Sequence, residues 1–368
     1  CSSDLTVDNT GDAIFVDNIS AANSDNIGTL ILSSARHIQF RNNASTFNAL
    51  TVSATTDIYV DVDLTTDTGD MILSADTDAS GGAEGMFLRF GPTLTSAGDI
   101  TLSASSNGAG IDANASVTMV AGGTFTIVSG TTFNTNNNAL SLTALDVDLQ
   151  GAIDAGSSNI TILVSNNGTI GLGNTAGSMT IDGSELQNIS AASLTLGSTT
   201  NGNVTVDGIT AANSDNIATV TINSGGDIDF SSNDSVFNAL NLNAVTDINV
   251  NTNLETDTGD FVAVADFELN NVGDFNLNAG NTVTSASDID ITAENVSLDG
   301  NLLAGGTITV NGAIITGGPI TIQAVDGIIF TDDVLNNGDI TIDAYTDRNG
   351  VGDFEIVGGK ILKSFDNN

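Results

Sequence analysis

The sequence predicts an all-β protein, a right-handed single-stranded parallel β-helix (β-solenoid) with roughly 20 residues per turn. Three observations lead to this fold class. Short segments alternate apolar and polar residues, a long internal repeat keeps its register without gaps, and Gly-Asp pairs recur where the next strand begins.

Residues 47–70, FNALTVSATTDIYVDVDLTTDTGD, contain the repeating unit. Successive side chains of a strand point to opposite faces, so alternate residues share one side. The first strand places on one side Leu50, Val52 and Ala54. The second places on one side Ile58, Val60, Val62 and Leu64, and on the other Asp57, Tyr59, Asp61 and Asp63. Each strand therefore has one face suited to a core.

A long repeat divides the chain into two homologous arrays. The segment AANSDNI begins at Ala21 and again at Ala211, an offset of 211 − 21 = 190, and FNAL and TDTGD recur at the same offset. Asp61 and Asp63 become Asn251 and Asn253 in the second copy, whereas the inward Leu64 is retained as leucine. We predict one continuous solenoid over 1–368, made of tandem arrays 1–190 and 191–368.

A shorter period of about 20 residues lies within each array. Its mark is Gly-Asp followed by an apolar residue, as at Gly69, Gly98, Gly226, Gly259, Gly273, Gly338 and Gly352. Glycine provides the positive φ of a tight corner, and Asp can bond its own backbone there. Antiparallel hairpins would not explain the register kept over so many residues. About 18 stacked turns would form a rod on the order of 90 Å long. We expect no helix beyond a single turn near 183–188.

The charge of the chain excludes several classes of partner. Lys and Arg number 6 against 45 Asp and Glu, which gives a net charge of −39. Nucleic acids and anionic membranes are bound by clustered Lys and Arg, so neither is an expected partner. Hydrophobic residues make up 40% and occur in alternating runs, which excludes disorder, and no apolar run is long enough to be a membrane-spanning segment. The acidic surface would gather cations or keep the protein soluble in salt.

The repeat texture resembles a known family. GDITLS from Gly98 and GGTITV from Gly305 are similar to the repeats of filamentous-haemagglutinin-like exoproteins, bacterial surface proteins of the two-partner-secretion type. This resemblance implies a parallel β-helix, secretion, and service as a shaft for adhesion or surface assembly. The Asn-Pro motifs of that family's secretion domain do not occur in the sequence, which leaves the export route open.

The single cysteine excludes an internal disulfide framework. Cys1, followed by Ser2 and Ser3, resembles the acylated first residue of a mature bacterial lipoprotein. This resemblance implies a lipid anchor on an extracellular or cell-surface protein. The alternative is that the numbering starts at an arbitrary or processed end.

Two acidic segments are candidate metal sites, and Ca²⁺ is the cation that they would bind, because hard cations prefer clustered oxygen ligands. DTDASGGAE offers Asp76, Asp78, Ser80 and Glu84. DRNGVGDFE offers Asp347, Asn349, Asp353 and Glu355. Neither completes a known calcium loop, and ordinary acidic turns are the alternative at both.

The ends of the chain show no polar cap, although a solenoid leaves unpaired backbone on its first and last turns. The last segment, IVGGKILKSF, contains both lysines of the chain, Lys360 and Lys363, followed by Phe365. We predict head-to-tail stacking of copies, with these residues meeting Asp4 and Asp8 in a contact that generates an open filament. The alternative is a window from a longer solenoid, whose neighbouring turns cover both ends.

Catalytic residues are scarce, so we predict that the protein is not an enzyme. His37 is the only histidine, and Asp227 occupies its place in the second array. The function predicted from the sequence is an extracellular structural subunit of a surface filament or adhesin shaft, with possible cell-surface or glycan ligands. The alternatives are a calcium-binding surface-layer or matrix protein and, third, a polysaccharide-acting enzyme on a β-helix face.

Overall fold

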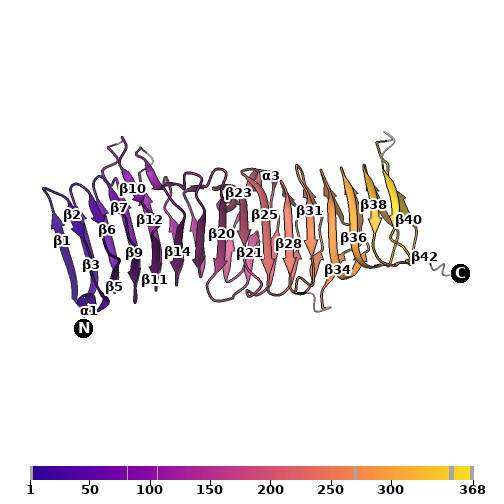
Figure 1. The fold of residues 1–368 in the computed structure, drawn as a ribbon, viewed down its shortest axis with the longest axis horizontal. Coiled ribbons are helices and arrows are strands. Elements are labelled where there is room, and N and C mark those ends of the chain that lie inside the picture. Colours follow the sequence, from indigo (N-terminus) through magenta and orange to yellow (C-terminus); the bar gives the residue numbers. More distant parts are fainter. Residues whose placement is uncertain (1–2, 81, 106, 269–271, 348–351, 365–368) are drawn as a thin grey trace. The chain divides into compact units, whose positions relative to one another are not determined.

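A computed structural model describes residues 3–80, 82–105, 107–268, 272–347 and 352–364 (Figure 1). Cys1, Asn349 and Phe365 lie outside these ranges. The protein is nearly all-β, a parallel β-solenoid of about 16 turns with roughly 22 residues per turn. The predicted fold class is therefore confirmed, but the turns are slightly longer and fewer than the sequence period indicated. Long corners such as residues 76–84 account for the difference.

The chain divides by its contacts into two compact units, 1–166 with 184–194 and 167–183 with 195–368. The arrays 1–190 and 191–368, in contrast, are defined by sequence homology. We describe each unit separately and call the three faces of a turn first, second and third. The same names apply to both units because strands that lie 190 residues apart carry homologous sequence.

Successive turns of unit 1 add short strands to three faces, and in the first turn α1 (Ala21–Ser24) follows β2 where later turns have a third-face strand. The first face is a seven-stranded sheet of β1 (Ser3–Asn9), β3 (Ile27–Ser34), β6 (Leu50–Ala54), β9 (Met71–Ala75), β12 (Ile100–Ala104), β15 (Thr124–Ile127) and β18 (Asp146–Leu149). The second face contains β2 (Ile14–Val16), β4 (Ile38–Phe40), β7 (Ile58–Val60), β10 (Gly85–Leu88), β13 (Gly110–Ala113), β16 (Thr132–Asn134), β19 (Ala152–Asp154) and β23 (Ile189–Leu196). The third contains β5 (Ser45–Phe47), β8 (Leu64–Thr66), β11 (Thr93–Ser96), β14 (Val117–Ala121), β17 (Leu140–Ala144) and β20 (Asn159–Val164).

Unit 2 repeats this arrangement. Its first face contains β25 (Ile217–Ser224), β28 (Leu240–Ala244), β31 (Phe261–Val264), the first parts of β34 (Ile289–Leu298) and β36 (Thr307–Thr316), β38 (Gly327–Phe330) and β41 (Asp353–Ile356). Its second contains β21 (Ile170–Gly173), β22 (Met179–Ile181), β24 (Val204–Asp207), β26 (Ile228–Phe230), β29 (Ile248–Val250), β32 (Asp274–Leu277), the later parts of β34 and β36, β39 (Val334–Asn336) and β42 (Leu362–Ser364). Its third is the six-stranded sheet of β27 (Ser235–Phe237), β30 (Leu254–Thr256), β33 (Thr282–Ser285), β35 (Asn301–Ala304), β37 (Ile320–Ala324) and β40 (Ile340–Asp343).

Equivalent residues of successive turns form columns in the core. Leu50 pairs with Leu30 of the preceding turn and with Met71 of the next, all three through parallel strands. Along β6 the inward residues are buried and Thr51 and Ser53 are half-buried, as the alternation predicts. The predicted face of Leu50, Val52 and Ala54 is thus confirmed, and each column excludes water from the strands that it joins.

The prediction of one strand from Ile58 to Leu64 is wrong in one respect. It is broken into β7 and β8, and Val62 lies at the corner between them, half-buried. Ile58, Val60 and Leu64 are each 0% exposed. The alternation continued across the corner, so the pattern alone did not reveal the break.

Three short helices interrupt the strands in the described residues. α2 (Gly183–Gln187) lies where a helical turn was expected, whereas α1 (Ala21–Ser24) and α3 (Ala211–Ser214) form from the repeated AANS, which the sequence did not identify as helical. The Ser24 hydroxyl donates a hydrogen bond to the carbonyl of Thr46 on the next turn at 3.0 Å. In unit 2, Ser214 makes the same bond to Val236. Tertiary contacts therefore stabilise helices too short to form alone.

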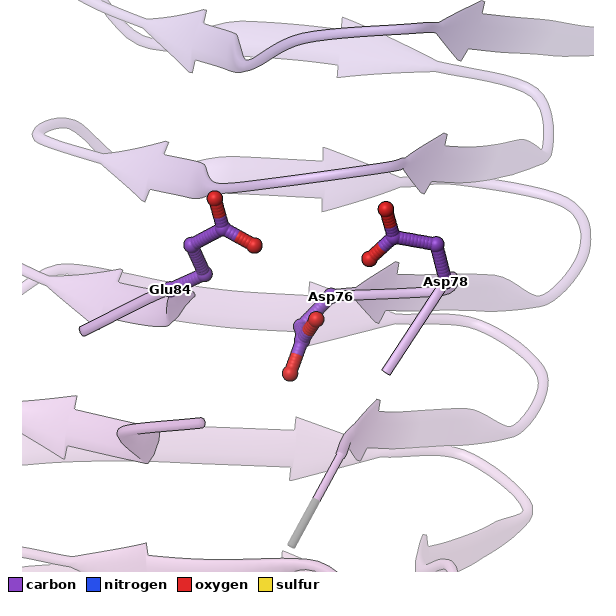
Figure 2. A group of neighbouring side chains, drawn as sticks. All are labelled: Asp76, Asp78 and Glu84. Atoms are coloured by element: carbon purple, nitrogen blue, oxygen red, sulfur yellow. The ribbon is translucent and has the colours of Figure 1, made fainter. Parts of the chain in front are cut away.

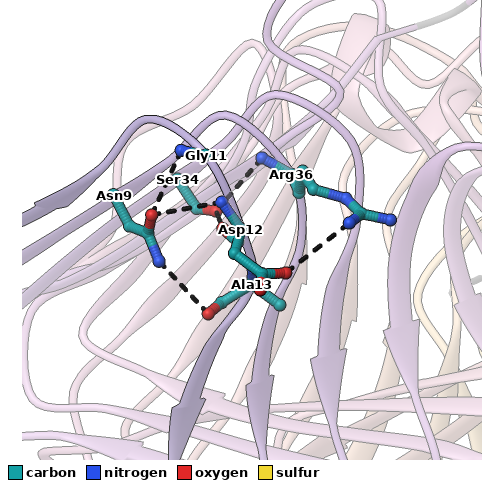
Figure 3. Close-up of polar contacts among 6 residues, drawn as sticks. All are labelled: Asn9, Gly11, Asp12, Ala13, Ser34 and Arg36. Atoms are coloured by element: carbon teal, nitrogen blue, oxygen red, sulfur yellow. Dashed lines mark hydrogen bonds and ion pairs between the residues drawn. The ribbon is translucent and has the colours of Figure 1, made fainter.

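Polar corners tie the first turn of unit 1 to the second, as Figure 3 shows. The Asn9 side-chain oxygen accepts hydrogen bonds from the backbone N–H groups of Gly11 and Asp12. The Ser34 hydroxyl donates to the carbonyl of Asp12 at 2.9 Å, and Arg36 forms an exposed ion pair with the Asp12 carboxylate. Backbone polar groups of the corner are thus satisfied by the neighbouring turn.

No helix within the described part of the chain has the length and apolar character required to cross a membrane.

Candidate functional site

The corner between β9 and β10, residues 76–84, contains the first predicted metal site (Figure 2). The strand ends at Ala75, and Asp76 then turns the chain with a positive φ of 48°. Its backbone N–H donates to the carbonyl of Thr56 on the preceding turn at 2.7 Å. Asp tolerates this left-handed conformation better than most residues, which accounts for its presence at the corner.

The corner brings three carboxylates together. One oxygen of each of Asp76, Asp78 and Glu84 lies within 4.8 Å of the others. Ser80 organises the segment, because its N–H donates to Asp78 at 3.1 Å and its hydroxyl donates to Glu84 at 3.0 Å. The residues singled out in DTDASGGAE therefore lie close enough to share one cation.

Asp76 differs from the other two carboxylates in its burial. Asp76 is only 2% exposed, and neither of its carboxylate oxygens has a hydrogen-bond partner. Asp78, in contrast, is exposed, and Glu84 is half-buried. Burial raises the pKa of Asp76, and the neighbouring negative charge of Asp78 raises this pKa further. A buried carboxylate without partners is costly, so the site has unsatisfied negative charge.

The next turn closes over Asp76. A Cβ atom on Gly108 would lie 2.5 Å from an Asp76 carboxylate oxygen and 2.2 Å from the carbonyl of Glu84. The N–H of Ala109 donates to that same carbonyl at 2.6 Å. Only glycine allows this close approach, and it is the approach that removes Asp76 from water.

The corresponding corner of unit 2 keeps the buried aspartate. Asp266 lies 190 residues after Asp76, is 6% exposed and also has a positive φ, of 59°. No second group of three acidic ligand atoms occurs at this corner or elsewhere in the described ranges. The corner aspartate is thus common to both units, and the cluster belongs to unit 1.

The second predicted metal segment is not assembled in the described residues. Asp353 and Glu355 are exposed on β41, and Asp347 follows β40 in another part of the turn. Asn349 lies outside the described residues. The predicted site at Asp347, Asn349, Asp353 and Glu355 therefore gains no geometric support.

The N-terminal turn of unit 1 exposes its inward side chains. Leu5 is 44% and Val7 39% exposed, although both occupy core columns, opposite Leu30 and Leu32. Around them lies an apolar hollow of about 450 Å³, which Phe15 and Phe47 also line. The strand β1 forms the edge of the first-face sheet, so its outer backbone groups have no strand partner among the described residues.

The C-terminal turn of unit 2 is similarly bare. Phe354 and Leu362 are 40% and 45% exposed, although they continue core columns from Ile328 and Val334. Ile361, beside them, is 50% exposed. Both described ends therefore present apolar side chains and strand edges.

Two of the charged residues predicted to meet between copies, Lys360 and Asp4, have partners within their own chain. Lys360 lies 2.5 Å from an Asp332 carboxylate oxygen, and this contact lowers the pKa of Asp332 and raises that of Lys360. Asp4 accepts a hydrogen bond from the N–H of Thr29 at 2.9 Å. Asp8 and Lys363 are exposed.

A row of aromatic side chains on the outer second face of unit 1 was not predicted. Phe15 and Tyr59 flank His37 in edge-to-face contacts at 5.7 Å, and Tyr59 stacks on Phe87 at 5.3 Å. The Arg89 guanidinium lies 4.5 Å from the Tyr59 ring centroid. His37, considered above as a catalytic residue, is thus part of this packed row.

The acidic side chains that flank β7 also have structural partners. Arg89 holds Asp61 through two hydrogen bonds of 2.6 and 2.8 Å, the Tyr59 hydroxyl donates to Asp57, and the N–H of Thr93 donates to Asp63. At the same positions of unit 2, Asn249 donates to Asp229 and accepts from Asn276. The outer second face therefore carries aromatic and ionic contacts in unit 1 and an amide ladder in unit 2.

These features define the class of protein, a parallel β-solenoid whose described residues include an acidic corner cluster. Searches found no protein family whose model matches the chain, and no curated protein and no solved structure that matches it. The resemblance to filamentous-haemagglutinin-like exoproteins stays a prediction.

Proposed function

We propose that the chain is an extracellular structural protein, a β-solenoid subunit that stacks head-to-tail in a surface filament or adhesin shaft. The observation that supports this best is the exposure of core-column residues at both described ends. Exposed contiguous apolar surface commonly marks an interaction site, and unpaired strand edges accept further strands.

The two ends are compatible in the order of their faces. Unit 2 ends on the first and second faces with β41 and β42, and unit 1 begins on the first and second faces with β1 and β2. A second copy can therefore continue the same three-faced winding. In this arrangement Phe354 and Ile356 would lie on Leu5 and Val7, and Leu362 would lie on Ile14.

The contact joins two different surfaces, so it is heterologous and does not close on itself. Each junction would cover the apolar side chains of both ends and pair two strand edges through parallel hydrogen bonds. Asp4, Asp8 and Lys363 would lie at the rim of the junction, where opposite charges favour the correct orientation.

The experiment uses two variants of the full chain, Leu5→Asp and Phe354→Asp. Each variant blocks one end, so each should be monomeric alone in sedimentation velocity, while the unchanged chain forms a concentration-dependent series of oligomers. An equimolar mixture of the two variants should give dimers and nothing larger, because one good end of each kind remains.

Thr6→Asp is the matched control, because Thr6 is an exposed outward residue of the same strand, β1. This variant should assemble like the unchanged chain. A chain that is monomeric at all accessible concentrations, or a mixture of the two blocked variants that remains monomeric, would contradict head-to-tail stacking.

A calcium-binding surface-layer or matrix protein is the second candidate. The observation in its favour is the acidic corner at Asp76. Assembly that requires Ca²⁺ and is reversed by chelation would favour this function over a calcium-independent filament.

A further inference from the structure

The acidic corner contains a buried carboxyl group that no cation in the described structure neutralises. Asp76 is 2% exposed and both of its carboxylate oxygens have no hydrogen-bond partner. A polar atom in such a position ordinarily has a partner, and a buried charge is ordinarily paired or bound to a metal ion.

The neighbouring side chains increase this imbalance. Asp78 and Glu84 each place an oxygen within 4.8 Å of the others, so the corner collects up to three negative charges. The described arginines of unit 1 are engaged elsewhere, since Arg36 pairs with Asp12, Arg89 pairs with Asp61 and Arg41 stacks on Phe15. No described arginine of unit 1 is therefore placed to neutralise the corner.

We propose that Asp76, Asp78 and Glu84 bind one Ca²⁺ ion through their carboxylates. Three carboxylates from one corner suit the variable geometry and oxygen preference of Ca²⁺, whereas Mg²⁺ requires a stricter octahedron and releases its water less readily. The exposed sides of Asp78 and Glu84 leave room for water to complete the coordination shell.

The ion would act as a clamp across successive turns. The Asp76 backbone is bonded to Thr56 on the preceding turn, and the Glu84 carbonyl accepts from Ala109 on the next. Binding would hold the two ends of the corner together and would fix the surface on which Gly108 packs. The proposal does not depend on head-to-tail stacking, because every ligand comes from one corner of one chain.

The first measurement is thermal unfolding of the full chain, treated beforehand with a chelator that is then removed, in a series of CaCl₂ concentrations. MgCl₂ at matched ionic strength serves as the comparison, because a chain of net charge −39 binds divalent ions weakly over its whole surface. We expect half-saturation near about 10⁻⁴ to 10⁻³ M, the range of extracellular calcium modules. Amide exchange of the corner should slow by up to about 100-fold when Ca²⁺ reaches about 100 times its dissociation constant.

Asp76→Asn tests the ligand, because it keeps the shape of the side chain and removes the charge. This variant should lose the calcium-dependent protection of residues 76–84. In chelator it should unfold at a higher temperature than the unchanged chain, because the unbalanced buried charge is gone. Glu84→Gln, at a half-buried site, provides a second test that cannot be attributed to misfolding of the core, and it should weaken calcium binding.

Asp266→Asn is the matched control, since Asp266 occupies the equivalent corner of unit 2 without an assembled cluster. This variant should retain the calcium response of the unchanged chain. Equal responses to Ca²⁺ and Mg²⁺, or an unaltered calcium response in Asp76→Asn, would overturn the proposal. Both outcomes are independent of whether the protein forms filaments.

Discussion

The core column at Val60 provides a quantitative test of the stacked-turn architecture. Val60 is 0% exposed and lies between Phe40 of the preceding turn and Leu88 of the next. Val60→Asp would place a carboxyl group in this dry column. The group can avoid an unpaired buried charge only by taking up a proton, which costs about 1.4 kcal/mol for each pH unit above its ordinary pKa of about 3.9.

The magnitude follows from comparison with Val60→Asn, which buries a polar group of similar size that does not ionise. At pH 7 the carboxyl lies about three units above its ordinary pKa, so Val60→Asp should be less stable than Val60→Asn by about 4 kcal/mol. At pH 5 the difference should fall to about 1.5 kcal/mol. The direction of the pH dependence follows because burial raises the pKa of the introduced carboxyl group in the folded state. The loss of stability therefore grows as the pH rises.

Urea unfolding followed by circular dichroism at both pH values measures this difference, with the unchanged chain as reference at each pH. Hydrogen exchange should place the damage in β4, β7 and β10, because a solenoid turn contacts only its neighbours. Thr51→Asp, an outward substitution, should change stability little. A difference between the two Val60 variants that does not change with pH, or that is absent at pH 7, would refute the inward dry column.

Three further predictions test the corners. Asn48→Ala and Asn238→Ala each remove a side-chain donor to a backbone carbonyl near α1 and α3, respectively. Each substitution should lower the free energy of unfolding by about 1 to 2 kcal/mol. Unequal losses would argue against the same role for the two asparagines. Asp234→Ala removes hydrogen bonds that lower the pKa of Asp234. Because Asp234 is exposed and solvent screens its charge, the loss should be less than about 1 kcal/mol. The stabilisation by these hydrogen bonds is present above the unfolded-state pKa, near 3.8, and is lost as the pH falls through the lower pKa of the folded state. An effect of Asp234→Ala on stability that does not change with pH would contradict this prediction. Gly110 has a φ of +72°, and a Cβ atom there would lie 2.5 Å from a backbone carbonyl oxygen. Gly110→Ala should therefore lower the free energy of unfolding, measured by denaturant titration, by about 1 to 3 kcal/mol. An unchanged unfolding midpoint would refute the close approach.

Alternation and repetition were enough to predict the core. Leu50, Val52 and Ala54 are buried as the period of two requires, because strands in one sheet have no other way to present a continuous apolar face. The acidic cluster was also identified from its residue types. The burial of Asp76 could not be predicted, because it depends on the approach of Gly108 from the following turn.

Other features depend on how successive turns align, and turn length varies along the chain. The aromatic row joins Phe15, His37 and Tyr59 at equal intervals (37 − 15 = 59 − 37 = 22) but reaches Phe87 only after 87 − 59 = 28 residues, so a single sequence period does not reveal the whole row. The ion pair between Lys360 and Asp332 likewise joins adjacent turns across a corner. Short helices such as α1 escape detection because their contacts, not their intrinsic propensity, stabilise them.

The stacked Tyr59 provides a spectroscopic reporter at a known place. The chain has no Trp and two Tyr, so its near-ultraviolet emission comes from Tyr59 and Tyr345. Tyr59 stacks on Phe87 and donates to Asp57, whereas Tyr345 follows β40 in unit 2. Replacing Tyr345 by Phe would leave a single fluorophore, whose emission would follow the melting of the second-face sheet in unit 1 without any attached dye.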